Sequence, residues 1–446
     1  MKYFNRIKSR WLENGILHRM IRNAGYLLSS NSIVMGVSMV QSAIAARILD
    51  VAGFGLLGTI TVFSTVVNKL TSFRMGELVI KFVGYYHEND DHARASAIFK
   101  LAALVEMAAS LLAFLLIWLL APLGARYFAK DPAASSWFTI YGVVILVNLV
   151  FESATGLLQL FDRFKRLAGL TIAQSFITLG LIVAAWLTDG GMMAVLAAYM
   201  AGKAMNAVGL TVAAFKEAAN RWGKGWWKTP LSVIRPQIRT LVAFAISTNI
   251  SASLSLINKD SELLWVSFFT SPLQAGYYKV TLALANLLQI PVAPLPQATY
   301  PELSRSVAKK NWKDMRYVLR QGSRLASIYS IAAALVLVIF GRLIIQYLYT
   351  PDFSPAYDGL IVLVAGIVIA NSLYWARSAL LSLGLAQYAT LVNVLVTALK
   401  VIGVIILLPR IGYVGSAIML AISHALGTSL SALKVRSEIK RQELSS

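Results

Sequence analysis

Eight basic residues lie inside segments that are otherwise apolar enough to be membrane helices: Arg47, Lys69, Arg74, Lys203, Lys259, Lys279, Arg377 and Lys400. A charge at bilayer depth costs roughly 2.5 to 3.5 kcal/mol on insertion scales unless it faces water or a partner. If all eight faced lipid, the total cost would be on the order of 20 kcal/mol. We therefore expect most of them to line a cationic cavity inside a helix bundle, where the reduced dielectric strengthens their attraction for anions such as phosphate.

Each of these charges has two interpretations. A basic side chain near a helix end can extend to the lipid headgroups at little cost. That explanation weighs equally with a cavity role for Arg47, Lys279 and Arg377, which lie near predicted helix ends. The cavity interpretation is favoured for the residues at greater depth, which are Lys69, Arg74, Lys203, Lys259 and Lys400.

Fewer carboxylates lie at similar depth, namely Glu77, Glu106, Glu152, Asp260 and Glu262. Residues three apart share one face of a helix, so we expect Arg74 to pair with Glu77 and Lys259 with Glu262. Even complete pairing leaves an excess of positive charge. We interpret Asp260, Glu77 and Glu152 as counter-ions or as carboxylates that couple transport to a cation, and for Asp260 the counter-ion role is favoured.

A proline-rich segment lies close to these charges in the sequence. Residues 274–302 are mainly apolar but include Pro291, Pro294 and Pro296. Proline removes a backbone hydrogen bond, which neighbouring helices or cavity water must replace within a membrane. We predict a hinge at these three prolines.

The composition is that of an integral membrane protein, because 57% of the 446 residues are hydrophobic and only 14% are charged. A membrane-spanning helix needs about 20 mainly apolar residues. Twelve segments meet this requirement: 24–48, 54–82, 95–120, 135–160, 168–188, 191–216, 239–268, 274–302, 319–345, 357–382, 387–408 and 414–434. The sequence thus predicts an all-α integral membrane fold with twelve transmembrane helices.

Several kinds of chemistry find no support in the sequence. The chain has no cysteine and four scattered histidines, so neither a disulfide nor a thiolate metal site can form, and no histidine pair has metal-binding spacing. There is also no Gly-rich phosphate loop of the Walker type and no supported Ser/His/Asp arrangement. We therefore expect no enzyme, no catalytic residues, no metal, no cofactor and no ATP hydrolysis.

The charge distribution predicts the orientation in the membrane. The formal net charge is +21, and basic residues concentrate in the first 23 residues, in alternate connections and in the tail. The positive-inside rule places these parts in the cytoplasm, with both termini, and explains the charge without a nucleic-acid partner. We expect 1–23 to be a cytoplasmic amphipathic lead-in, 217–238 a basic, Trp-rich cytoplasmic linker and 435–446 a cytoplasmic tail.

An internal duplication divides the chain in two. Residues 51–55 (Val-Ala-Gly-Phe-Gly) match 274–278 (Gln-Ala-Gly-Tyr-Tyr), and 89–94 match 311–316, at a similar offset. We expect an N-terminal six-helix lobe at 24–216 and a C-terminal one at 239–434, related by a pseudo-twofold axis along the membrane normal. Transporters built from such parallel repeats bind substrate between the halves and alternate access by rocking them.

Four stretches match known motifs in order. Residues 46–55 contain Ala-Arg-Ile-Leu-Asp and Gly-Phe-Gly, similar to an Ala-Arg-x-Leu-Gly and aromatic-Gly signature in which Asp50 replaces a glycine. Asp260 with Gly276-x-Tyr278, and then Pro-Glu-Leu-Ser at 301–304, resemble an Asp, Gly-x-Tyr and Pro-x-Leu-Ser run. Residues 409–417 resemble a Pro-x-x-Gly-x-x-Gly-Ala-Ala turn. Together they resemble the polysaccharide flippases of the multidrug, oligosaccharidyl-lipid and polysaccharide exporter superfamily.

This resemblance implies a flippase that moves an undecaprenyl-diphosphate-linked oligosaccharide, an O-antigen or exopolysaccharide repeat unit, across the bacterial inner membrane by alternating access. It implies membrane lipids and the polymerase and chain-length proteins of the same pathway as partners. A sodium or proton gradient, the substrate gradient or consumption of the product would supply the driving force.

Two other functions stay open on the sequence. A cation-coupled multidrug antiporter of the same superfamily would be expected to have an essential carboxylate in a mostly uncharged lobe, whereas basic residues occur in both halves here. A membrane enzyme of glycan assembly would be expected to have a large outer loop with clustered acids or arginines, and the predicted outer loops are short.

Overall fold

The computed structural model describes residues 15–246, 249 and 261–444, and the ordered elements in these ranges are all helices or helical turns. They form two compact units. The first comprises the described residues up to Ile48, then Ile60–Arg126 and Asp131–Ser261, and the second comprises Leu49–Thr59, Tyr127–Lys130 and Glu262 onward. The predicted all-α membrane fold is confirmed, and the twofold relation between the lobes stays a prediction.

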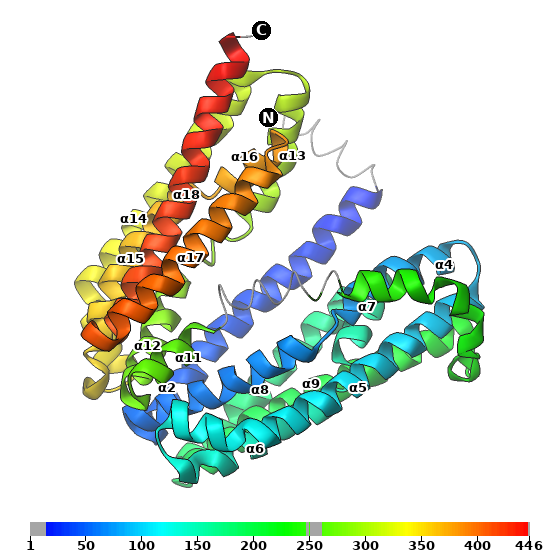
Figure 1. Cartoon of the computed structure of the whole chain (residues 1–446), viewed down its shortest axis with the longest axis horizontal. Helices are drawn as coiled ribbons and strands as arrows, with labels where there is room; N and C mark the ends of the chain where they lie inside the picture. Colours follow the sequence, from blue (N-terminus) through cyan, green and yellow to red (C-terminus); the bar gives the residue numbers. More distant parts are fainter. Residues whose placement is uncertain (1–14, 247–248, 250–260, 445–446) are drawn as a thin grey trace. The chain divides into compact units, whose positions relative to one another are not determined.

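The first unit contains most of α2 (Gly15–Thr71) and the elements that follow it, as Figure 1 shows in blue to green. These are α3 (Met75–Leu78), η1 (Val79–Val83), α4 (Gly84–Glu88), α5 (His92–Gly124), η3 (Pro132–Ala134), α6 (Ser135–Val147), α7 (Phe151–Leu160), α8 (Phe164–Leu187), α9 (Gly191–Trp222), η4 (Trp226–Lys228) and η5 (Leu231–Gln237). The turn η2 (Ala125–Ala129) joins α5 to η3.

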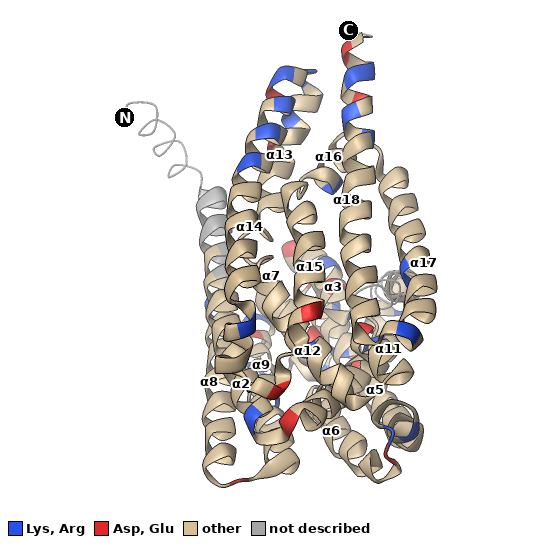
Figure 2. Ribbon diagram, turned by 90° about the vertical axis from the view of Figure 1, so that its left-hand side faces the viewer, with Lys and Arg blue, Asp and Glu red and all other residues tan. Residues whose placement is uncertain are grey.

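The second unit contains α11 (Glu262–Phe269), α12 (Pro272–Leu287), α13 (Leu295–Ala308), α14 (Trp312–Leu348), η6 (Pro351–Phe353), α15 (Ala356–Ser372), α16 (Ala376–Ser382), α17 (Ala386–Ile411) and α18 (Tyr413–Leu444). Helix α15 packs against α14 and α18, and α18 also packs against α17. The basic residues of α18 gather at its C-terminal end (Figure 2).

Among the described residues, nine helical segments are long and apolar enough to cross a membrane. The difference from the twelve predicted helices has three causes. The segments 24–48 and 54–82 join in one stretch, Ser29–Thr71; the segment 239–268 lies partly outside the described residues; and 274–302 is broken between α12 and α13. The first and third causes concern continuity of the helix, and the second concerns only which residues the structure describes.

Helix α2 consists of two helices that meet at a kink at Asp50. At about 1.5 Å per residue, its 57 residues would be about 85 Å long, against a hydrocarbon core of about 30 Å. Asp50 interrupts it with φ 58° and ψ −174°, a conformation that glycine adopts most easily, and its Oδ1 accepts a hydrogen bond of 2.8 Å from Gly53 N. Asp50 therefore replaces the glycine of the motif by capping the helix that follows it.

Each unit contains a pair of interrupted helices. In the first, the chain leaves helical geometry at 72–74 and 148–150, and α3 packs on α7 so closely that a Cβ on Gly156 would lie 2.6 Å from Gly76 O. In the second, it does so at 288–294 and 373–375, and α13 packs on α16. The break at 288–294 contains Pro291 and Pro294, and Pro296 lies in the first turn of α13. A hinge at these three prolines stays a prediction. Each predicted half thus contains two helix breaks with the helices that follow them packed together.

The two segments matched by the duplication touch each other inside the second unit. A Cβ on Gly55 would lie 1.9 Å from Pro272 O, and a Cβ on Gly276 would lie 2.2 Å from Val51 O. Only glycine at both positions allows these backbones to approach so closely. Gly412, with φ 64°, turns the chain between α17 and α18, and Tyr413 N then donates to Gln274 Oε1 at 2.8 Å.

The basic linker packs on the first unit and does not run free between lobes. Trp226 and Ile234 are buried in the core of that unit, and Thr229 O accepts a hydrogen bond of 3.2 Å from Lys100 Nζ on α5. Leu241 and Ala245 join the same core. The first unit thus includes the described residues of the basic linker and the described residues that follow it up to Asn249. The predicted bounds of the two lobes stay a prediction.

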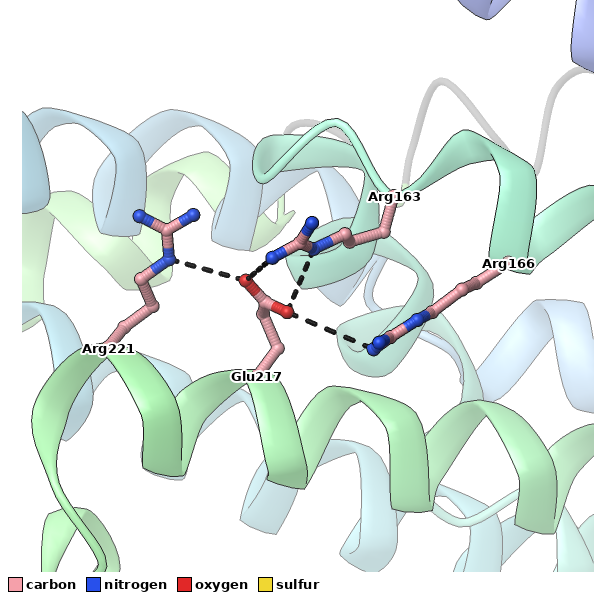
Figure 3. Close-up of polar contacts among 4 residues, drawn as sticks. All are labelled: Arg163, Arg166, Glu217 and Arg221. Atoms are coloured by element: carbon pink, nitrogen blue, oxygen red, sulfur yellow. Dashed lines mark hydrogen bonds and ion pairs between the residues drawn. The ribbon is translucent and has the colours of Figure 1, made fainter.

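A buried carboxylate holds three arginines where α9 ends (Figure 3). Glu217 is 1% exposed and accepts two hydrogen bonds from Arg163, of 2.8 and 2.9 Å, and one of 3.3 Å from Arg221. Arg166 lies 4.0 Å from its second oxygen. This cluster ties the connection between α7 and α8 to α9.

We expect Glu217→Gln to lower the melting temperature of the purified protein by about 2 to 3 °C, since losing a charge-assisted pair costs about 1.5 to 3 kcal/mol and the unfolding entropy of a long chain is large. The measurement is intrinsic fluorescence during heating in detergent. Glu88→Gln, an exposed carboxylate of the same unit, is the control and should leave the melting temperature unchanged. Equal melting temperatures for both variants would mean that the arginine cluster does not stabilise the fold.

Candidate functional site

A polar cavity of about 320 Å³ lies inside the first unit. It is formed by α2, α5, α6, α7, α8 and α9. Its charged and amide side chains are Asn68, Lys69, Glu106, Asn148, Glu152, Gln174, Lys203 and Asn206. So many polar groups within membrane helices indicate a site for a polar ligand, because each is costly in hydrocarbon.

The two helix breaks of the first unit lie at this cavity. Ser72, from the first break, and Asn148, from the second, both line it. Irregular backbone is tolerated at membrane depth where it is buried in protein or borders a water-filled space. Interrupted helices also mark substrate sites in transporters, because they free backbone groups and helix ends for binding.

Glu106 shapes the cavity by capping α7. Its carboxylate accepts hydrogen bonds from Glu152 N at 2.6 Å, Ser153 N at 2.8 Å and Ser153 Oγ at 2.6 Å. A carboxylate at a helix N-terminus is stabilised by the unpaired N–H groups and the helix dipole. We assign Glu106 a positioning role, since its oxygens are occupied by the start of α7.

Two lysines bring positive charge to the cavity. Lys203, on α9, donates a hydrogen bond of 2.9 Å to Tyr141 Oη, and Lys69 lies near the end of α2. Glu152 accepts a bond of 3.4 Å from Ser72 Oγ. With Glu106, the cavity holds two basic and two acidic groups, so its formal charges balance. The predicted excess of positive charge is not found among the residues that line this cavity.

Some buried polar atoms in the cavity are not satisfied by the described residues. Asn206 Nδ2 donates to Gln174 Oε1 at 2.7 Å, but Asn206 Oδ1 and Ser64 Oγ have no hydrogen-bond partner there. A buried polar atom without a partner costs about 1 to 3 kcal/mol. A ligand rich in hydroxyl donors would supply the missing bonds.

These features suit a ligand with both anionic and hydroxyl groups. Lysine Nζ atoms bind anionic oxygens, and Asn, Gln and Tyr side chains exchange hydrogen bonds with sugar hydroxyls. In the part of the chain that the structure describes, no three His, Asp or Glu side chains lie together as metal ligands would. The side chains of the cavity can bind such a ligand and orient it.

The sequence of residues 20–307 matches the family model described as polysaccharide biosynthesis protein. The chain belongs to this family. The match confirms the resemblance predicted from the motifs. The chain is also 22% identical over 351 residues to the inner membrane protein YghQ of Escherichia coli strain K12, an alignment that covers 78% of this chain and 97% of that protein.

Solved structures show the same fold. The protein resembles an inward-facing MATE family multidrug resistance transporter of the MOP superfamily, with a TM-score of 0.72, 13% identity and coverage of 93% of this chain and 96% of that one. It also resembles the lipid II flippase MurJ, with a TM-score of 0.69, 13% identity and coverage of 94% and 90%. This member of the family is thus a multi-pass membrane protein with the fold of the MOP superfamily.

Three of the predicted site residues, Lys69, Lys203 and Glu152, line the cavity. Arg74 and Glu77 pair with each other at 3.1 Å and are half-exposed. Arg47 and Arg377 are exposed on α2 and α16. Lys259 and Asp260 lie outside the described residues.

Lys400 and Lys279 lie in the second unit, in separate environments. Lys400, on α17, is buried and forms an ion pair with Glu262, which also accepts a hydrogen bond of 2.7 Å from Tyr278 Oη. The predicted partner of Glu262 was Lys259, three residues before it, which lies outside the described residues. Among the described residues, Glu262 forms its ion pair with Lys400. Lys279 Nζ lies 3.7 Å from the centre of the Phe54 ring, and donates to Phe54 O at 3.3 Å.

The sequence reasoning missed the neutral part of the site. Tyr141, Gln174 and Asn206 line the cavity, yet single amides and tyrosines in membrane helices are also common at helix contacts. One feature of the sequence could have indicated these residues. Gln174, Lys203 and Asn206 are three of the few polar residues in the apolar segments 168–188 and 191–216.

Proposed function

We propose that this protein is a flippase for an undecaprenyl-diphosphate-linked oligosaccharide and moves it from the cytoplasmic to the periplasmic leaflet by alternating access. The observation that supports this most is the polar cavity of the first unit, in which two lysines lie among amide and hydroxyl groups. The lysines suit the diphosphate, and the neutral groups suit the sugars. Membership of the polysaccharide biosynthesis family agrees with such a substrate.

A cation-coupled multidrug antiporter is the second candidate, because Glu106 and Glu152 lie in the same cavity as the lysines. Glu106 is held by three hydrogen bonds, which leaves Glu152 as the carboxylate able to exchange a cation for a drug. An antiporter would lose activity with Glu152→Gln and keep it when the lysines are neutralised. A flippase would show the reverse order of sensitivity.

The direct test is reconstitution of the protein in vesicles with a fluorescent lipid-diphosphate oligosaccharide and a quencher that reaches one leaflet only. We expect the protein to move the probe between leaflets and the Lys69→Gln/Lys203→Gln variant to move it at least about tenfold more slowly, since each lost charge-assisted bond is worth about 1.5 to 3 kcal/mol. Dye efflux in a pump-deficient strain tests the antiporter. Efflux without probe movement would refute the flippase proposal.

A further inference from the structure

A second cavity, of about 760 Å³, lies in the other unit between the start of α14 and the end of α18. Four basic side chains, Arg316, Arg320, Arg436 and Lys440, line it. Figure 2 shows basic residues gathered at this end, where α13 passes into α14 and where α18 ends. The proposed transport uses none of these residues.

The positive charge of this cavity is largely uncompensated. Glu443 is its single lining carboxylate and pairs with Arg316. Among the described residues, no carboxylate lies within ion-pair distance of Arg320, Arg436 or Lys440. Three exposed cations on one concave surface repel each other and favour an anion between them.

The floor of the cavity is apolar. Leu319, Trp375 and Ile439 line it and belong to the buried core of this end of the unit. Trp375 Nε1 donates to Ser323 Oγ at 2.6 Å, so its polar atom is satisfied, and the small part of its buried ring that borders the cavity is apolar. A basic rim around an apolar floor fits an amphiphile better than a free ion.

The cavity lies at the depth where the membrane surface is expected. On α14, exposed residues change from basic at Arg320 and Arg324 to apolar at Leu325 and Ile328. On α18 they change from apolar at Leu433 to basic at Arg436 and beyond. Such a change on two neighbouring helices marks the headgroup region, and the positive-inside rule assigns it to the cytoplasmic leaflet.

We propose that this cavity binds an anionic phospholipid, with its phosphate between Arg320, Arg436 and Lys440 and the beginning of its acyl chains over Leu319, Trp375 and Ile439. An anionic glycerophospholipid matches the charge, the apolar floor and the depth. The lipid would brace the start of α14 against the end of α18. This site does not depend on the flippase function, since it lies in the other unit and concerns the membrane's own lipid.

The test is lipid binding by the purified full chain, followed by native mass spectrometry. The probes are phosphatidylglycerol, phosphatidylcholine, undecaprenyl diphosphate and inorganic phosphate. In Arg320→Gln/Arg436→Gln/Lys440→Gln we expect phosphatidylglycerol binding to weaken at least about tenfold, because charge-assisted bonds to phosphate are lost. The control, Lys309→Gln/Lys310→Gln/Lys313→Gln, removes the same charge from exposed lysines that do not line the cavity, and should bind as the unaltered protein does.

Equal weakening in both triple variants would overturn the proposal, since the effect would then be general electrostatics. It would also fail if inorganic phosphate bound as tightly as phosphatidylglycerol, or if only undecaprenyl diphosphate responded to the triple substitution. All three cavity residues are exposed, so the variant is expected to fold, and an unchanged elution profile in size-exclusion chromatography checks this.

Discussion

Neutralising Lys69 and Lys203 together by glutamine is expected to lower surface polysaccharide output at least about tenfold in cells that depend on this protein, without loss of the protein from the membrane. Both lysines line the polar cavity of the first unit, and Lys203 is held toward it by Tyr141. Glutamine keeps most of the side-chain size and hydrogen bonding while removing the charge. The expected loss therefore reports on the attraction for the diphosphate.

The matched control is Lys165→Gln/Lys216→Gln, which removes two exposed lysines of the same unit that do not line the cavity. Output from this variant should equal that of the unaltered protein. Polymer is quantified by gel analysis, and the protein by immunoblotting of membranes. Normal output from the cavity variant at normal protein level would remove these two lysines from the substrate site.

Replacing Lys400 by methionine is expected to destabilise the second unit by about 3 to 5 kcal/mol, because a buried carboxylate is then left without its partner. Lys400 and Glu262 are 5% and 6% exposed, and Tyr278 completes the cluster with a hydrogen bond to Glu262. The measurement is the amount of folded protein in fluorescence-detected size-exclusion chromatography. We expect most of the folded peak to be lost.

The double variant Lys400→Met/Glu262→Gln is expected to regain much of the folded peak, since it removes both charges of the pair. The double variant also decides the role of Lys400. If Lys400 binds substrate, as predicted from its depth in the membrane, the rescued protein will be folded and inactive. If its role is to neutralise Glu262, the rescued protein will flip the fluorescent probe at near its normal rate. A single variant that keeps its full folded peak would show that the pair does not stabilise this unit. A double variant as poorly folded as the single one would show that the loss does not come from the unpaired Glu262.

The lengths of the apolar segments predicted most of the membrane helices, and prolines within a segment predicted one of the helix breaks. Pro291 and Pro294 predict the interruption between α12 and α13 from the sequence alone. The break at 148–150 has no glycine or proline, and the capping carboxylate that orders the start of α7 comes from Glu106, on α5. A break that depends on a distant side chain leaves no local signal.

The charged residues also divide into those whose partners are near in sequence and those whose partners are distant. The pairing of Arg74 with Glu77 was predicted from helical spacing and is present, although Arg74 lies at the N-cap of α3 and not inside a continuous helix. The partner of Glu262 is 138 residues away, in another helix, and no period in the sequence relates the two. Depth in the membrane identified Lys69 and Lys203 as polar positions, but only the folded unit shows that they share a cavity with Gln174 and Asn206.

Residues 49–59 belong to the second unit, although the chain before and after them belongs to the first. This arrangement limits where the protein can be cut into fragments. A cut near Ser261 would leave Gly55 in one fragment and its contact surface, Pro272 and Gly276, in the other. Neither product would be a self-sufficient folding domain, so fragment complementation should require both pieces to be made together.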